Sequence, residues 1–202
     1  MLQFLDHIDQ RLFFFLNGMH NPFFDTVMYH VTGLLVWLPL YLLFLYLVIR
    51  EYRWQTLIVI AFVAILILVS DQLCNIVKET VHRFRPSNDP ALTTVHIVNG
   101  YRGGTFGFYS AHASNNFALA VFLILLIGQR FRYIIIPLLV YAFLISYTRI
   151  YLGVHYPGDT ISGAIAGTII GYCLGKLCQR TILILSQPKS LSSPERHRDT
   201  EN

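Results

Sequence analysis

Hydrophobic and polar positions divide this chain into long uncharged runs separated by short polar stretches. Five runs contain no Asp, Glu, Lys or Arg: residues 31–49, 54–70, 113–129, 133–148 and 160–175. A spanning helix needs about 18–20 mostly apolar residues, and the first run is long enough. The others are slightly short, but each is extended by Asn, Ser, Cys or a single ionisable residue, as in functional bundle helices. The pattern predicts an all-α, polytopic membrane bundle of about five spanning helices.

The first 30 residues follow a different pattern. Apolar residues recur at helical spacing with charges between them, in the order Phe4, Leu5, Asp6, Ile8, Asp9, Arg11, Leu12 and Phe15. This arrangement is typical of an amphipathic helix that lies in the membrane interface. The alternative is a sixth, imperfect span, and the three charges within residues 6–11 weigh against it.

A single domain over residues 1–185 is expected, because no internal repeat is visible. Residues 79–108 form the one long loop before the tail, rich in Pro and Gly, and such a loop either carries function or lacks order. His96 and Arg102 on this loop are candidates to contact a lipid head group. Residues 186–202 are rich in Ser, Pro and charge, which predicts a disordered tail.

Composition and charge support a membrane protein rather than a nucleic-acid binder. The chain is 54% hydrophobic and 13% charged, against about 25% charged residues in soluble domains. If five helices alternate across the membrane, the tail side receives nine cations: Arg50, Arg53, Arg130, Arg132, Lys176, Arg180, Lys189, Arg196 and Arg198. The other side receives six: Arg11, Lys78, Arg83, Arg85, Arg102 and Arg149. The positive-inside rule therefore places the tail in the cytoplasm, and the opposite end in the periplasm of a bacterial inner membrane.

Small and polar residues in the helices indicate close packing. Cys74, Cys173 and Cys178 suit neither a zinc site nor an obvious disulfide, so we expect buried thiols. The fifth run carries glycine at every fourth position, Gly163, Gly167, Gly171 and Gly175. Such a stripe lets another helix approach closely, either in the same chain or in a partner.

One helix face in the second span carries polar residues. Asp71, Asn75 and Lys78 recur at i, i+4 and i+7. A carboxylate inside a span needs a partner in the bundle. We favour a hydrogen-bond or charge-pair role for Asp71, with support of Lys78 as the alternative.

Three stretches at the ends of the runs hold residues that bind or attack phosphate. They are Lys78-Glu-Thr-Val-His-Arg-Phe-Arg85-Pro86, Tyr109-Ser110-Ala111-His112, and Thr148-Arg149 through His155 to Asp159. They supply three cations, two imidazoles, a hydroxyl and a carboxylate. These groups are sufficient to bind a phosphoryl group, attack it and protonate the leaving oxygen.

The cations Lys78, Arg85 and Arg149 match phosphate chemistry. Arg presents a planar fork of donors to phosphate oxygens, and Lys adds a point charge. The alternative is that all three extend to the interface as ordinary basic residues. Their joint occurrence on the side with fewer basic residues favours a phosphate site. His82 and Arg83, within the first stretch, occupy positions that this pattern leaves unconstrained.

The remaining groups suit catalysis. Ser110 precedes the third span, where it caps the helix or donates to phosphate, and helix N-termini favour anions. His112, half a turn later, is placed to protonate a leaving alkoxide. A carboxylate at Asp159 that holds one nitrogen of His155 fixes its tautomer and leaves the other nucleophilic. The alternative for this pair is an interfacial histidine followed by an N-capping aspartate.

The three stretches resemble the type 2 phosphatidic acid phosphatase family, whose pattern is Lys-x6-Arg-Pro, Pro-Ser-Gly-His and Ser-Arg-x5-His-x3-Asp. The first and third spacings match in full. Tyr109, Ala111 and Thr148 replace Pro, Gly and Ser. None of the three removes a reactive group, although the methyl group of Ala111 narrows the phosphate pocket.

The resemblance implies roles for the individual residues. His155 is the expected nucleophile, oriented by Asp159, and His112 is the general acid that later activates water. The phosphate clamp comprises Lys78, Arg85, Ser110 and Arg149, with the N–H of Ala111. No metal or other cofactor is expected, since the cations supply the charge that a metal would otherwise provide.

The leading function is therefore an integral-membrane lipid phosphatase. The family suggests undecaprenyl pyrophosphate, phosphatidylglycerol phosphate, phosphatidic acid or a lipid A phosphate as substrate. The compact chain slightly favours a small or linear head group and leaves lipid A open. The alternatives are phosphotransfer to a lipid through the same phosphohistidine, a haloperoxidase, which is disfavoured because those relatives are soluble, and lipid binding or transport without turnover. Oligomeric state is left open.

Overall fold

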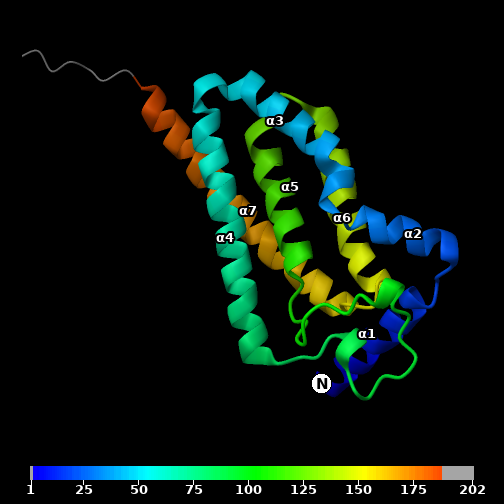
Figure 1. Cartoon of the computed structure of the whole chain (residues 1–202). Coiled ribbons are helices and arrows are strands. Elements are labelled where there is room, and N and C mark those ends of the chain that lie inside the picture. The colour runs from blue at the N-terminus through cyan, green and yellow to red at the C-terminus, as the bar shows by residue number, and fades with distance from the viewer. Residues whose placement is uncertain (1, 188–202) are drawn as a thin grey trace, which may run out of the picture.

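The structure, a computed structural model, describes residues 2–187 and is built of helices joined by short connections and one long loop (Figure 1). The α-helices are α1 (Leu2–Asn17), α2 (Pro22–Val31), α3 (Leu38–Tyr52), α4 (Thr56–Val81), α5 (Ala111–Ile127), α6 (Ile135–Tyr151) and α7 (Pro157–Ser186). The predicted all-α class is confirmed. The expected disordered tail lies outside the described residues beyond Gln187.

Helices α3 to α7 correspond to the five uncharged runs. Three stretches are long and apolar enough to cross a membrane, and the first, Leu34–Val81, contains both α3 and α4. The others are Arg132–Tyr151 and Pro157–Ser186, and α5 is a shorter apolar helix. One expected boundary was wrong: α4 continues through Lys78 to Val81, so the loop begins at residue 82 rather than 79. The chain is an integral membrane protein.

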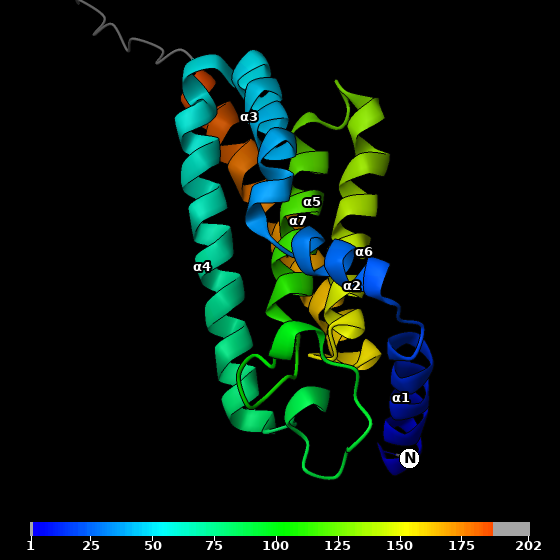
Figure 2. The same cartoon turned by 45° about the vertical axis from the view of Figure 1, so that its right-hand side comes forward.

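The bundle has two chemically different ends (Figures 1 and 2). The α3–α4 and α5–α6 connections lie at the end where α7 finishes, and the long loop, the α6–α7 turn and α1 lie at the other. Helix α2 runs across the side of the bundle and packs on α6. The three stretches with phosphate-binding residues therefore all lie at the end of the bundle that carries the long loop, which we call the loop end.

The closest helix packing joins α5 and α7 through the glycine stripe. A Cβ at Gly167 would lie 2.1 Å from the carbonyl oxygen of Ser114, and one at Gly171 would lie 2.3 Å from that of Ala118. Only glycine permits this approach of two backbones. The stripe is thus filled by α5 of the same chain, which places the start of α5 directly beside the start of α7.

Helix α1 turns its apolar face outward. Phe4, Leu5, Ile8, Leu12 and Phe15 are exposed, whereas Phe13 and Asn17 are buried against the bundle. This is the arrangement expected of an interfacial helix. Among the described residues, α1 and α2 are not counted with the stretches that could cross a membrane.

Candidate active site

The three predicted stretches converge where α4, α5, α6 and α7 meet. Ser110 is the N-cap of α5, and its hydroxyl accepts a hydrogen bond from the N–H of Ala113 at 3.4 Å. The N–H of Ser110 donates to the carbonyl oxygen of Asp159 at 3.0 Å. This bond joins the first turns of α5 and α7, because the glycine stripe has already brought the two backbones together.

His155 lies in the turn before α7 with its side chain only 1% exposed. Its Nε2 is 2.9 Å from Nη1 of Arg85. A guanidinium can only donate, so Nε2 is the acceptor and the ring proton is on Nδ1. Nδ1 faces Oδ2 of Asp159 at 3.4 Å. Burial and the nearby positive charges of Arg85 and Arg149 hold the pKa of His155 well below its ordinary value. The ring is thus neutral, with its lone pair on Nε2.

Asp159 is fully buried, and its two oxygens are held by different groups. Oδ2 also accepts the N–H of Tyr156 at 3.0 Å, which closes the first turn of α7. Oδ1 accepts from Nη1 of Arg83 at 2.8 Å. This carboxylate is therefore fixed in position before it can orient the imidazole of His155. The structure places it inside the first turn of α7 and not at the N-cap, which is Tyr156.

Arg83 is the functional-site residue that the sequence reasoning missed. Its Nη2 binds Asp9 at 2.7 Å and Asp6 at 2.9 Å, while Nη1 holds Asp159. Burial opposes its charge, but Asp159 and Asp9 outweigh burial and raise the pKa of Arg83. The two partners on α1 are 74 and 77 residues away along the chain. No local sequence pattern connects residues at that separation.

Arg85 and Arg149 are buried without a carboxylate partner among the described residues. Arg85 is 8% exposed and donates from Nε to the carbonyl oxygen of Phe106 at 3.1 Å. Arg149 is 2% exposed and donates to Thr32 at 2.9 Å and Tyr101 at 3.1 Å. Its Nε has no hydrogen-bond partner in the described chain. Burial and the like charge of Arg149 lower the pKa of Arg85, so these cations repel one another.

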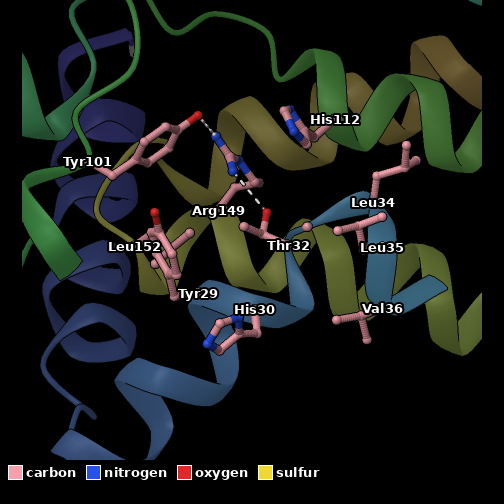
Figure 3. Close-up of a pocket in the computed structure, with 11 residues that line it drawn as sticks. Tyr29, His30, Thr32, Leu34, Leu35, Val36, Tyr101, His112, Arg149 and Leu152 are labelled. Carbon is pink, nitrogen blue, oxygen red and sulfur yellow. Dashed lines mark hydrogen bonds between the residues drawn. The ribbon is translucent and has the colours of Figure 1, made fainter. Parts of the chain in front are cut away.

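A cavity of about 380 Å³ opens beside Arg149 (Figure 3). Arg149, Tyr101 and His112 line one side, and the segment Tyr29–Val36 lines the other. His112 is exposed to the cavity, and its imidazole makes no hydrogen bond within residues 4–187. Lys78 is half-buried, and its charge acts on both His112 and His155. Of the predicted site residues, His112 and Arg149 thus line this cavity, and Arg85 contacts His155 deeper in the chain.

Other predicted residues have structural contacts. Asp71 accepts a hydrogen bond from Nδ2 of Asn115 at 2.8 Å, which confirms a hydrogen-bonding role. Arg102 donates to the carbonyl oxygen of Ser87 at 2.5 Å and so closes the loop on itself. The cysteines are free, and Cys173 is exposed rather than buried as expected, because it lies on the outer face of α7.

His96 joins the loop to the N-terminal segment. Its Nε2 is 2.9 Å from Oδ1 of Asp25, and its ring stacks on His20 with centroids 3.6 Å apart and planes 1° from parallel. These three residues are close enough together to suggest a metal site. The lone pairs of two parallel stacked rings, however, lie in two planes separated by the stacking distance, so they do not both point at one ion. In this geometry the cluster is a structural junction.

Comparison with known proteins identifies one family model and two curated relatives, both of which are named phosphatases. The family model of the PAP2 superfamily matches residues 56–182. The lipid A 4'-phosphatase of Bacteroides thetaiotaomicron is 46% identical over 176 residues, covering 85% of this chain and 77% of that protein. The lipid A 4'-phosphatase of Porphyromonas gingivalis is 32% identical over 179 residues, covering 87% and 75%.

Two crystal structures have a similar fold. LpxE of Aquifex aeolicus aligns with a TM-score of 0.62 and 27% identity over 83% of this chain and 94% of that chain. A transmembrane PAP2-type phosphatidylglycerolphosphate phosphatase of Bacillus subtilis aligns with a TM-score of 0.65 and 21% identity over 88% and 87%. The latter likeness concerns the fold alone. With the family model spanning α4 to α7 and 46% identity to a curated relative, the chain belongs to the PAP2 superfamily, the type 2 phosphatidic acid phosphatases.

Proposed function

We propose that this chain is a membrane lipid phosphatase that hydrolyses the 4'-phosphate monoester of lipid A through a phosphohistidine on His155. Two relatives named lipid A 4'-phosphatase, at 46% and 32% identity, support this substrate over the smaller head groups. Phosphotransfer to a second lipid through the same intermediate is the alternative activity. It differs only in the acceptor that receives the phosphoryl group.

The observation that carries the proposal is the pair of buried arginines without a carboxylate among the described residues. Burying an unpaired charge is costly unless a ligand compensates it. Arg85 and Arg149 lie beside a neutral imidazole, and Nε of Arg149 lacks a partner. A phosphate dianion satisfies both guanidinium groups through charge-assisted hydrogen bonds. The apolar residues Leu34, Leu35 and Val36 on the facing wall suit the hydrocarbon of a lipid.

The chemistry follows from the tautomer of His155. Phosphate oxygens replace Nε2 as acceptors for Arg85, which frees the lone pair to attack phosphorus. The P–O bond to the lipid breaks, and His112 gives its proton to the leaving oxygen. Asp159 stabilises the positive charge that develops on the ring of His155. His112 then takes a proton from water, which attacks the phosphohistidine and releases inorganic phosphate.

The other clamp groups act on the charge of the transferred phosphoryl group. Lys78 adds a positive charge, and the N-terminus of α5 presents Ser110 and the N–H of Ala111. Such fixed donors contribute most where they meet charge that develops in the transition state. The mechanism uses no metal ion, because the cationic side chains neutralise the phosphate.

We further propose that the loop end faces the periplasm of a bacterial inner membrane and the end of α7 faces the cytoplasm. The distribution of basic residues supports this orientation. In a background without the three cysteines, a Cys at Asn88 should react with an impermeant maleimide on intact spheroplasts, and one at Gln129 should react only after lysis. The reverse labelling pattern would contradict the orientation.

The test of function is phosphate release by the purified protein in detergent. We expect release from lipid A, in the presence of EDTA, and inhibition by vanadate, which mimics five-coordinate phosphorus. Mass spectrometry of the product identifies the position of the lost phosphate. Phosphatidic acid, phosphatidylglycerol phosphate and undecaprenyl pyrophosphate are tested in parallel. Activity that requires added Mg²⁺ or Zn²⁺, or the absence of release from lipid A, would disprove the corresponding part of the proposal.

A further inference from the structure

A second cavity lies behind His112, within the bundle. It has a volume of about 430 Å³ and shares Thr32, Gly33, Leu34 and His112 with the cavity beside Arg149. Its remaining polar lining consists of Tyr41, Asp71, Asn115, Asn116 and Tyr141. The first cavity thus lies on the Arg149 side of His112, and the second lies on the opposite side of that residue.

The polar groups of this second cavity have unused acceptors. Asn115 donates Nδ2 to Oδ1 of Asp71 at 2.8 Å, which also fixes the orientation of its amide. Oδ1 of Asn115 is buried and has no partner among the described residues. Asp71 accepts no other hydrogen bond from the described chain. Tyr141 is already engaged, because it donates to Oδ1 of Asn116. A ligand that donates hydrogen bonds would therefore satisfy acceptors that the described chain leaves unpaired.

The position of the cavity identifies which part of a substrate would occupy it. Asn115 and Asn116 follow His112 by three and four residues, which is one turn farther along α5 toward the middle of the bundle. Asp71 faces them from α4 and lies about two turns before Lys78. The cavity is thus on the membrane side of the residue that protonates the leaving oxygen. The leaving group of the reaction belongs there.

The chemistry of the unused acceptors distinguishes between leaving groups. A polyprenyl chain has no N–H or O–H group near the cleaved bond, and diacylglycerol contributes only ester oxygens, which are themselves acceptors. Phosphatidylglycerol offers a single glycerol hydroxyl. An acylated amino sugar carries an amide N–H and hydroxyl donors on the same ring as its phosphate. A carboxylate inside a membrane bundle is costly and marks function, and an acceptor left unpaired by a ligand without donors penalises that ligand.

We propose that Asp71 and Asn115 form a sugar-binding subsite that selects an acylated amino sugar as the leaving group. This inference rests on the proposed phosphatase function and extends it by naming the residues that determine specificity. Ligand donors reach the carboxylate of Asp71 from the cavity, and a rotation of the Asn115 side chain brings its buried Oδ1 within their reach. The acyl chains of the sugar extend along the apolar wall of Leu34, Leu35 and Val36. The phosphate remains with Arg85 and Arg149.

The experiment compares two substrates in three variants. Asp71→Asn keeps the shape and one acceptor but removes the charge, and Asn115→Leu removes the unpartnered acceptor. Gln72→Leu, the same kind of change at an exposed neighbouring position of α4, is the matched control. We expect kcat/KM for lipid A to fall about 10- to 100-fold in the first two variants, the usual loss for a hydrogen bond to a charged group. Activity on short-chain phosphatidic acid should change less than about twofold, and Gln72→Leu should match wild type on both.

The outcomes separate this inference from the proposed function. Suppose that wild type hydrolyses lipid A. If both variants lose the same amount of activity on the two substrates, or lose no activity on either, the proposed subsite is wrong and the proposed phosphatase function is unaffected. If wild type acts only on diacylglycerol or polyprenyl substrates, both proposals fail. Retained activity on phosphatidic acid demonstrates that a variant is folded, and Asn115→Leu decides the question should Asp71→Asn lose both activities through misfolding.

Discussion

Two arginine regions lie side by side at the loop end and differ in how their charge is balanced. Arg83 binds three carboxylates, those of Asp6, Asp9 and Asp159. Arg85, two residues later, is more buried, yet it has no carboxylate partner among the described residues and faces His155 instead. Carboxylates of the protein thus balance the charge of Arg83, whereas no carboxylate of the described chain pairs with Arg85.

We interpret the surroundings of Arg83 as a supporting region and those of Arg85, Arg149 and His155 as the reactive region of the proposed mechanism. A guanidinium held by carboxylates has its charge neutralised and its geometry fixed, so it can position Asp159 but has little left to offer an anion. A buried guanidinium that lacks an anion is unfavourable in the protein alone. Such a group is retained where a ligand supplies the missing charge. The predictions below test this division, beginning with the largest effect.

Replacing His155 should have the largest effect on phosphate release. His155→Ala removes the proposed nucleophile, so phosphate release from lipid A should fall by at least about 10⁴-fold, as for other covalent catalysts. The matched control is His96→Ala, another histidine at the same end that binds Asp25 rather than an arginine. Phosphate release and trapping of an acid-labile phosphoenzyme are measured in both. Substantial turnover by His155→Ala would remove His155 from the mechanism.

The general acid should show an effect that depends on the leaving group. His112→Ala should reduce kcat on lipid A by about 10²–10⁴-fold, the usual contribution of proton transfer. The loss on p-nitrophenyl phosphate should be much smaller, because nitrophenolate leaves without protonation. Steady-state rates on both substrates are compared. An equal loss on the two would show that His112 binds or positions substrate and does not transfer a proton.

The two arginine regions should respond in opposite ways to the same change. Arg149→Met should reduce activity by about 10²–10³-fold, the typical cost of removing a fixed donor to the transition state. Its Tm should stay constant or rise, because an unpaired buried charge is removed. Arg83→Met leaves Asp159 and Asp9 without their cation, so Tm should fall by several degrees. Thermal shift in detergent and phosphate release are measured for both. A lower Tm in Arg149→Met than in Arg83→Met would reverse the assignment.

The features that could be predicted from the sequence also differ between the two regions. The convergence of the residues of the reactive region at one end of the bundle could be predicted because each stretch, from Lys78 to Arg85 and from Arg149 to Asp159, lies at the end of an apolar run. The apolar helices α3 to α7 could be predicted because uncharged runs follow from the bilayer itself. The partners of Arg83 on α1 could not, since nothing local relates residues more than 70 positions apart.

The same holds for the second cavity. Asp71 was recognised as an unusual carboxylate, but its contact with Asn115 requires knowledge of how α4 packs on α5. The glycine stripe predicted a close helix neighbour and left its identity open. Only the folded chain assigns that neighbour as α5, by the approach of Gly167 to Ser114. The sequence therefore predicted which residue types lie at the helix ends. Which helix faces pack against each other could be learned only from the structure.

The smallest expected effect is a pH dependence of stability that arises from His155. Its pKa is lowered in the folded protein, whereas an unfolded histidine titrates near about 6.5. Between these two values the unfolded chain binds a proton that the folded chain does not, so stability is full above pH 6.5 and falls as the pH decreases. The contribution is at most about 1.4 kcal/mol per pH unit. In His155→Gln this proton is absent, and the decrease in Tm from pH 7.5 to 5.5 should be smaller than in wild type. Equal decreases in the two proteins would mean that folding does not lower the pKa of His155, and the arginines would then not act on the ring as the structure indicates.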